Sequence, residues 1–319
     1  MNKLLKYWEA NKRKILITIG VIALVFICIR IANQLVKQQN ESKKNEIMQN
    51  SFSIVKDVTK PDETIISDTK LNEQQTEENS ALIKQFVEYC NQKQIQKAYE
   101  LISQDCKTEL YSNEQHFANN YINQIFTNAK NYQLELWAEK NGCYTYKITY
   151  NEGNPLQTGG YTSNNFIDYI TIVKDGKNQK LNISNFVNKE QLNKSAESNN
   201  VKVQVNSRSI YIDYEIYNIT VTNNTEKTIL LNDGKSPENF CLLDKNDNQY
   251  YSLIHEVAMS SLTINAKYTK TFKLKFNKMY YTNNQIKYMQ LKDIYLDKEQ
   301  YDINLNQENM ETTTIKIKL

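Results

Sequence analysis

The two histidines are the side chains best suited to acid–base or metal chemistry at neutral pH, and the sequence gives neither a partner. His116 and His255 are the only histidines in the 319 residues. Neither has a second metal ligand four residues away or an adjacent cysteine, as zinc sites require. The chain has no G-x-S-x-G turn for a serine nucleophile and no glycine-rich phosphate loop, and Gly159-Gly160 is interpreted as a turn. We therefore predict a protein that is not an enzyme, with no catalytic, cofactor-binding or metal-ligating residues.

Asp168 is the acidic residue with the least ordinary surroundings, because it interrupts the apolar run FIDYI at 166–170. If it were buried, its pKa would rise and it could serve as a general base, in a pocket lined by Tyr144, Tyr146 and Tyr169. The simpler interpretation places Asp168 on the solvated outer face of a sheet, and this is what we expect. The abundance of tyrosine, 22 residues, is more typical of sheet packing or of a protein-contact surface than of a ligand pocket.

One short motif resembles the start of a calcium loop, with Asp244, Asn246 and Asn248 at alternate positions. Such a loop needs a glycine at its sixth position and a bidentate glutamate at its twelfth. Those positions hold Gln249 and His255. We therefore expect a hairpin turn here rather than a metal site.

The cysteines show no metal-binding or redox spacing. Cys28 lies in an apolar run, and no C-x-x-C pair occurs among the other four, which excludes zinc ribbons and thioredoxin-like chemistry. These four are Cys90, Cys106, Cys143 and Cys241. Cys90 shares an apolar helix face with Phe86 and Val87, so we expect a small buried side chain. A Cys90–Cys106 disulfide is the alternative in an oxidising compartment.

The only uninterrupted apolar run, Ile15–Ile29, directly follows Lys12-Arg13-Lys14. With Arg30 bent back to the interface, residues 15–36 are long enough for a single transmembrane anchor. The basic flank predicts a cytoplasmic N-terminus at 1–14 and extracytoplasmic domains beyond the cell membrane. A cleaved signal peptide is the alternative, although the exit of the segment at 30–34, RIANQ, fits a cleavage site poorly.

Composition bounds the rest of the chain. The formal charge of +3 comes from 39 basic and 36 acidic residues that alternate, so we expect no nucleic-acid partner. Residues 37–79 are polar and predict a linker. The remaining length suits two domains, at 80–190 and 200–319, joined through the polar segment 188–200.

The first domain changes its hydrophobic period along the chain. Apolar residues at helical spacing predict three helices, the third preceded by a capping box at Ser112 and Gln115. Alternating residues, with a run at 166–173 that is apolar on both faces, then predict four antiparallel strands and a hairpin at Asp175-Gly176. Helices followed by strands indicate an α+β fold, with three helices on a curved antiparallel sheet.

The second domain consists of short alternating stretches separated by turns at 223–227 and 244–248. In 272–276, Phe272, Leu274 and Phe276 alternate with two lysines, as in a strand with one buried and one solvated face. Many such strands predict a β-sandwich.

Both domains resemble known families. The opening IKQFVEYCNQKQIQKAYELISQDC is similar to the nuclear transport factor 2-like superfamily of cone-shaped domains. Its helix pair ends in a segment matched here by Ala98, Tyr99, Leu101, Ile102 and Ser103. Membrane-anchored members of that superfamily include type IV secretion and conjugation assembly proteins. Their Asn-Pro-x-Gly loop is matched here only by Asn154-Pro155, because Gln157 occupies the glycine position.

The segments YNITVTNNTEKTI, FCLLDKNDNQYY and YTKTFKLKF resemble immunoglobulin-like domains of Gram-positive surface proteins. Modules of that kind bind other molecules or act as spacers. The antibody Cys…Trp…Cys pattern is absent here.

These observations predict a membrane-anchored extracytoplasmic scaffold or adaptor in a cell-envelope assembly, such as a conjugation or secretion apparatus. Its expected partners are the membrane, other envelope proteins and further copies of itself. The alternative is a surface-displayed small-molecule-binding or isomerase-like cone domain, which would need a pocket around Asp168.

Overall fold

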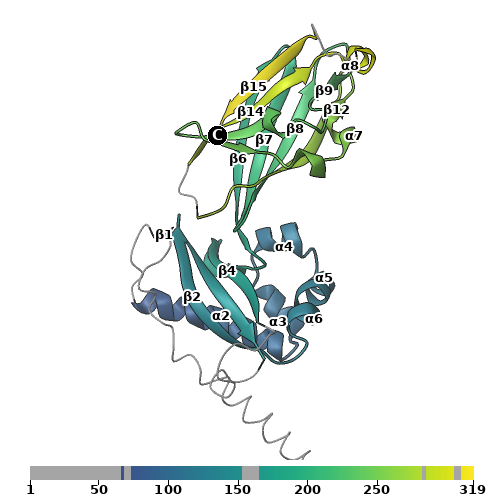
Figure 1. Cartoon of the computed structure of the whole chain (residues 1–319). Helices are drawn as coiled ribbons and strands as arrows, with labels where there is room; N and C mark the ends of the chain where they lie inside the picture. Colours follow the sequence, from purple (N-terminus) through teal and green to yellow (C-terminus); the bar gives the residue numbers. More distant parts are fainter. Residues whose placement is uncertain (1–65, 68–72, 153–164, 282–284, 305–309) are drawn as a thin grey trace, which may run out of the picture. The chain divides into compact units, whose positions relative to one another are not determined.

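The computed structural model describes residues 66–67, 73–152, 165–281, 285–304 and 310–319, which belong to one compact unit (Figure 1). Of these residues, the helices are too short or too polar to cross a bilayer. The predicted N-terminal segment 1–14 and anchor 15–36 lie outside the described residues. So do most of the linker 37–79 and the loop containing Asn154-Pro155 and Gly159-Gly160.

The N-terminal half begins with a series of helices. These are α2 (Glu73–Asn91), α3 (Ile95–Glu100), α4 (Gln104–Leu110), and α5 (Glu114–Phe117), which continues through the π-helical turn Ala118–Ile122 into α6 (Asn123–Ile125). Side-chain oxygens cap two of them: Ser103 accepts from the backbone N–H of Cys106, and Asn113 from that of His116. The predicted capping box at Ser112 and Gln115 is therefore displaced, since Asn113 is the N-cap.

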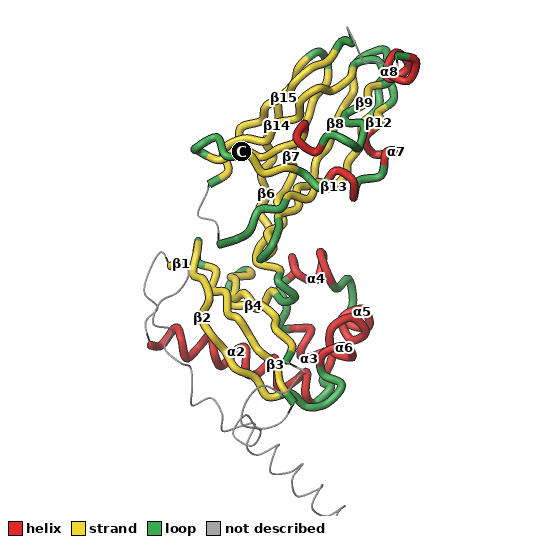
Figure 2. The backbone as a smooth tube through the Cα atoms, viewed as in Figure 1, coloured by secondary structure: helices red, strands yellow, loops and turns green. Residues whose placement is uncertain are grey.

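A five-stranded sheet, in the order β1-β2-β3-β4-β5, follows these helices. Its strands are β1 (Ile66–Ser67), β2 (Asn131–Lys140), β3 (Cys143–Asn151), β4 (Phe166–Asp175) and β5 (Asn178–Asn182). The first pair is parallel and the others are antiparallel. The β4–β5 hairpin turns at Gly176, where φ is +64° and a side chain would strain the backbone. Helix α2 crosses one face of the sheet, and buried residues from the helices and strands share one core (Figure 2).

The C-terminal half contains two further sheets. One has the order β13-β8-β7-β6, with β6 (Phe186–Ser198), β7 (Val201–Tyr211), β8 (Glu215–Asn223) and β13 (Thr269–Phe276). The other has the order β11-β10-β14-β9-β12, with β15 paired to β14. Its strands are β9 (Ile229–Leu230), β10 (Phe240–Asp244), β11 (Gln249–Tyr251), β12 (Thr263–Ile264), β14 (Ile286–Tyr295) and β15 (Thr312–Lys318). Helices α7 (Met259–Leu262) and α8 (Lys298–Ile303) lie in its connections.

Alternation explains why these two sheets share one core. Val201, Val203 and Val205 of β7 are fully buried, and so are the side chains at alternate positions of β8. Leu242, Met289 and Leu291 of the facing sheet join the same cluster. Because every second side chain of a strand faces the same way, each sheet contributes one apolar face and keeps one polar face.

The predicted fold class is wrong. The described chain is mainly β-structure in three sheets, and the N-terminal half does not form a cone of three helices on a four-stranded meander. It has additional short helices, such as α4, and a fifth, parallel strand, β1, which arises from the segment predicted as linker. Helix α2 also begins at Glu73, inside that segment, rather than at Ser80. The short elements escaped sequence analysis because two or seven residues give too little periodicity to detect.

The polar segment 188–200 is not a linker. Phe186–Ser198 forms the 13-residue strand β6, which pairs with β7 along nearly its whole length. Its residues are mostly polar because β6 is an edge strand whose outer face meets solvent. The helices and the first sheet also share their core with Phe186 of β6 and Tyr211 of β7. The β6–β7 hairpin therefore belongs to both halves of the described chain.

This arrangement changes the expected result of dividing the chain near residue 200. A fragment 200–319 lacks β6, so the hydrogen-bonding edge of β7 is exposed and Tyr211 loses Phe186. We expect it to unfold at lower urea concentration and with a lower m-value than fragment 186–319, because its sheet is incomplete. Urea titration by circular dichroism of both fragments measures this. Equal midpoints and equal m-values would show that β6 is dispensable.

Candidate functional site

Asp168 is buried, contrary to the expectation of a solvated outer face. Its relative exposure is 2%. The Tyr121 hydroxyl donates to Oδ2 at 2.9 Å, and the backbone N–H of Ser184 donates to the same oxygen at 3.3 Å. The backbone N–H groups of Tyr169 and Asn185 donate to Oδ1 at 2.7 and 3.2 Å. Each carboxylate oxygen thus accepts two hydrogen bonds, which matches the four lone-pair sites of the group.

The residues held by Asp168 form an unusual turn. Ser184 and Asn185, between β5 and β6, have φ angles of 57° and 63°. Two consecutive non-glycine residues in the left-handed region are costly unless their surroundings hold them. Asp168 accepts from both backbone N–H groups, and the carbonyl of Asn185 accepts from the N–H of Ile212 at 3.0 Å. The carboxylate therefore stabilises the turn that carries the chain from the first sheet into β6.

The predicted tyrosine pocket does not form around Asp168. Tyr146 lies on the same sheet face, but its hydroxyl accepts from Asn79 Nδ2 at 3.1 Å. Tyr169 faces the other way and packs on Trp137, with ring centroids 5.0 Å apart. Tyr144 is half-buried and packs at the edge of the core.

The tyrosines near the carboxylate are instead Tyr121 and Tyr150, whose hydroxyl oxygens are 3.2 Å apart. Both appear in the sequence as members of apolar faces, on a helix and on a strand. Nothing in their spacing shows that the fold brings them to Asp168, 47 residues from Tyr121.

Burial is the largest influence on the pKa values of Asp168 and Tyr121. It raises the pKa of Asp168 to about 6, although the four hydrogen bonds pull in the opposite direction. Burial, and then the negative charge of Asp168, raises the pKa of Tyr121 well above its usual value. Tyr121 therefore remains a protonated donor near neutral pH. The arrangement is chemically stable, and every acceptor site of the carboxylate is used within the protein.

The other residues considered from sequence occupy ordinary positions. His116 and His255 are exposed and lie in different halves of the described chain. Asp244 forms a hairpin turn, as predicted, by accepting from the backbone N–H groups of Asn246 and Asn248 at 2.8 and 2.9 Å. No group of three or more metal-ligating side chains occurs in the described part of the chain.

The four described cysteines are free thiols, and all are buried. Cys90 has no exposure, as expected of a core side chain, and the alternative Cys90–Cys106 disulfide is not formed. Burial raises the pKa of Cys106 to about 12, so this thiol is not a reactive thiolate.

A buried ionic network that the sequence does not predict lies at one end of the four-stranded sheet. Lys278 Nζ lies 2.9 Å from Glu215 Oε1, and both residues are at most 5% exposed. The Tyr217 hydroxyl donates to Glu215 Oε2 at 2.7 Å, and Arg208 approaches that oxygen at 3.6 Å. Arg208 also contacts Glu190 of β6 at 2.6 Å. Charges so far apart in sequence give no periodic signal.

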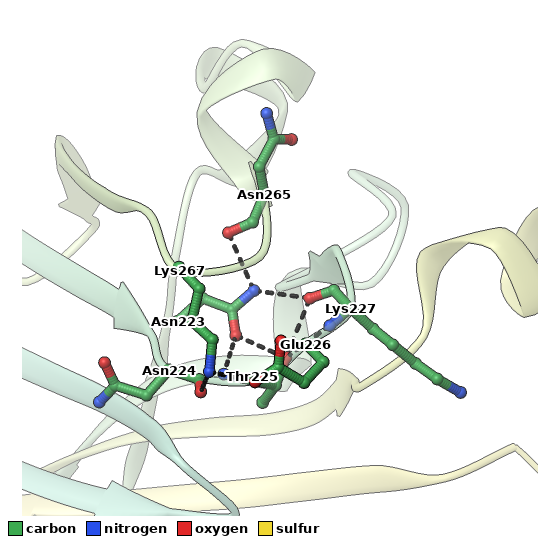
Figure 3. Close-up of polar contacts among 7 residues, drawn as sticks. All are labelled: Asn223, Asn224, Thr225, Glu226, Lys227, Asn265 and Lys267. Atoms are coloured by element: carbon green, nitrogen blue, oxygen red, sulfur yellow. Dashed lines mark hydrogen bonds and ion pairs between the residues drawn. The ribbon is translucent and has the colours of Figure 1, made fainter.

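At the turn predicted at 223–227, a buried asparagine organises the backbone (Figure 3). Asn223 Nδ2 donates to the carbonyls of Lys227, Ile264 and Asn265 at 2.8, 3.0 and 3.0 Å. Its Oδ1 accepts from the backbone N–H and hydroxyl of Thr225. Its amide is fully used in joining two connections of the sandwich, so this cluster has a structural role.

The exposed tyrosines of the described residues lie in the C-terminal half, although Phe166 of β4 in the N-terminal half is also 44% exposed. Tyr251, Tyr268 and Tyr281 are 47%, 62% and 45% exposed. In the N-terminal half, Tyr121, Tyr146 and Tyr150 are at most 1% exposed. Tyrosines available for contacts with other proteins are therefore found beside the second and third sheets.

Comparison with known proteins gives no family for the chain. No protein family matches it, and no curated protein is similar to it. One solved structure, the 2.2 Å crystal structure of a conserved hypothetical protein from Bacillus anthracis, is 14% identical over 39% of this chain and 95% of its own. The TM-score is 0.24, which is too low to support a conclusion about fold or function.

We expect Asp168→Asn to remove a pH dependence of stability. The folded-state pKa, about 6, lies above the value of 3.8 for an exposed aspartate. The folded protein therefore binds the proton more tightly. Stability from this group is fully present below pH 3.8 and is lost as the pH rises through 6. A shift of about two pKa units corresponds to roughly 3 kcal/mol as an upper bound.

Urea unfolding of the full chain in detergent at pH 4 and pH 7 measures this difference. The free energy of unfolding should fall between the two pH values by up to about 3 kcal/mol more in the wild type than in Asp168→Asn. Asp175→Asn, on the same strand but not fully buried, is the matched control. Its free energy of unfolding should change between the two pH values as much as that of the wild type. The same pH dependence in Asp168→Asn would show that other groups cause it.

For the buried network, we expect Lys278→Met to lower the free energy of unfolding by about 3 kcal/mol, because Glu215 keeps its burial but loses its nearest cation. Lys273→Met is the control. Lys273 contacts Glu109 at 3.0 Å with 59% of its side chain exposed, so its loss should cost less than about 1 kcal/mol. Equal losses of unfolding free energy in the two variants would contradict the claim that the buried ion pair contributes more than the exposed one.

Proposed function

We propose that this chain is a non-enzymatic, membrane-attached adaptor that works outside the cytoplasm. The observation that carries the proposal is the hydrogen bonding of Asp168, the strongest candidate for a general base. Its four hydrogen bonds are all internal, and three of them hold backbone N–H groups. A general base needs a free lone pair directed at a substrate proton, and Asp168 has none to offer. This weighs against the isomerase-like alternative.

The attachment and the side of the membrane rest on the sequence alone. The run Ile15–Ile29 behind Lys12-Arg13-Lys14 supports a cytoplasmic N-terminus followed by an anchor within 15–36. A narrower form of the proposal is an adaptor in a conjugation or secretion apparatus of the envelope.

Contacts with partner proteins are expected where tyrosine side chains are accessible. Tyr268 and Tyr251 offer apolar area with a polar tip, and they lose little conformational entropy on binding. This supports placing the adaptor surface on the C-terminal half of the described chain.

Two measurements in a Gram-positive host test the proposal. A C-terminal epitope on the full chain should be removed by protease added to intact protoplasts, and a variant lacking 15–29 should keep its epitope inside. A photo-crosslinking residue at Tyr268 should give adducts with envelope proteins, whereas one at buried Tyr217 should give none. An epitope protected in the full chain would contradict the proposed placement. Adducts equal at both positions, or none at either, would contradict the adaptor surface.

A further inference from the structure

Four lysines form a strip on the polar face of β14 and β15. Lys287 and Lys292 belong to β14, and Lys316 and Lys318 belong to β15. Lys287, Lys316 and Lys318 are exposed, and Lys292 is half-exposed. Ile315 and Ile317, on either side of Lys316 in β15, are buried in the sandwich core, so the two lysines of β15 face solvent.

Strand register brings these lysines together. Tyr288 lies opposite Lys318, and Gln290 lies opposite Lys316. The ammonium groups of Lys287 and Lys316 lie 5.3 and 4.4 Å from the centre of the Tyr288 ring. The strip therefore runs along the strands from Lys287 to Lys292, a length of about 17 Å at the usual rise per residue.

The four lysines of the strip form no close ion pairs, although the exposed Asp293 follows Lys292 in β14. No ion pair within 4.0 Å links any of the four lysines to an acid of the described chain. The charges that act on the neighbouring thiol of Cys241 are those of Lys292 and Lys316. The carboxylate of Asp244 is held by Asn246 and Asn248.

On the β10 side, the strip has a sharp boundary. At the level of Gln290 and Tyr288, the neighbouring strand β10 presents Cys241 and Leu243, and these are buried and uncharged. Beyond them β11, with sequence QYY, has no charged residue. A row of cations one or two strands wide suits a linear anionic chain better than a planar charged surface such as a bilayer, which would contact lysines spread over the whole sheet.

We propose that the β14–β15 lysine strip binds a linear phosphate polymer without bases. Lysine binds phosphate as a point charge, and successive lysines can meet successive phosphates of one chain. Nucleic acid is less suitable because single strands bind through bases stacked on open aromatic rings. The Tyr288 ring already has two ammonium groups against it. This inference goes beyond the proposed adaptor function and does not depend on it.

Binding of fluorescent inorganic polyphosphate to the full chain in non-ionic detergent tests the proposal by anisotropy. With about four charges neutralised, raising the salt from about 50 to about 200 mM should weaken binding roughly 100-fold. Replacing Lys287, Lys292, Lys316 and Lys318 by glutamine should weaken binding by about 100-fold at the lower salt, and the double variant K316Q/K318Q by about 10-fold.

A matched control changes the same net charge elsewhere. Glutamine at Lys97, Lys174, Lys177 and Lys202, all exposed and outside the ion pairs of the described residues, should weaken binding less than about 3-fold. Circular dichroism confirms that each variant is folded, and the double variant serves if the quadruple one is not. No polyphosphate binding by the wild type, or equal losses in strip and control variants, would overturn the proposal. So would binding of single-stranded DNA or anionic vesicles about 10-fold tighter than polyphosphate.

Discussion

The hydrogen bonds between the buried Asp168 carboxylate and the Ser184–Asn185 turn determine how the described chain passes from one sheet to the next. The turn that connects β5 to β6 contains two residues with positive φ, and neither is glycine. The ionised carboxylate in this position accepts from two partly buried backbone N–H groups that would otherwise lack partners, each worth about 1–3 kcal/mol. Tyr121 fixes the same group from the helical side. One side chain thus joins the helices, the first sheet and the start of β6.

Other contacts extend from this turn. Trp137 of β2 packs against Tyr280, and the two belong to a small apolar cluster with Val187 of β6. Glu109 of α4 contacts Lys189 of β6 and Lys273 of β13 at 2.8 and 3.0 Å. Partly exposed ion pairs of this kind contribute little alone. Their value lies in position, because they hold the β6–β7 hairpin that serves both cores.

The strongly periodic elements could be predicted from the sequence, and the long-range ones could not. The strands around Tyr144, Phe272 and Leu291 follow alternation, and the strand around Ile170 follows its continuous apolar run. The turns at 223–227 and 244–248 follow their asparagines and aspartates. The polar residues of β6 predict a joint between domains, because an edge strand with a solvated face has a mostly polar sequence. β1 and α4 were too short to give a period. The surroundings of Asp168 depend on residues from three separate segments, and a single sequence does not reveal such contacts. The same holds for Glu215 and Lys278, which are 63 residues apart.

Hydrogen exchange at single residues tests the role of Asp168 most directly. In the full chain, the amides of Ser184 and Asn185 should exchange slowly, since each donates to the carboxylate. In Asp168→Ala, both should exchange at least about 100-fold faster, together with the first residues of β6, while amides of β14 and β15 keep their protection. Unchanged protection at Ser184 and Asn185 in that variant would contradict the account, because the turn would then be held by something other than Asp168.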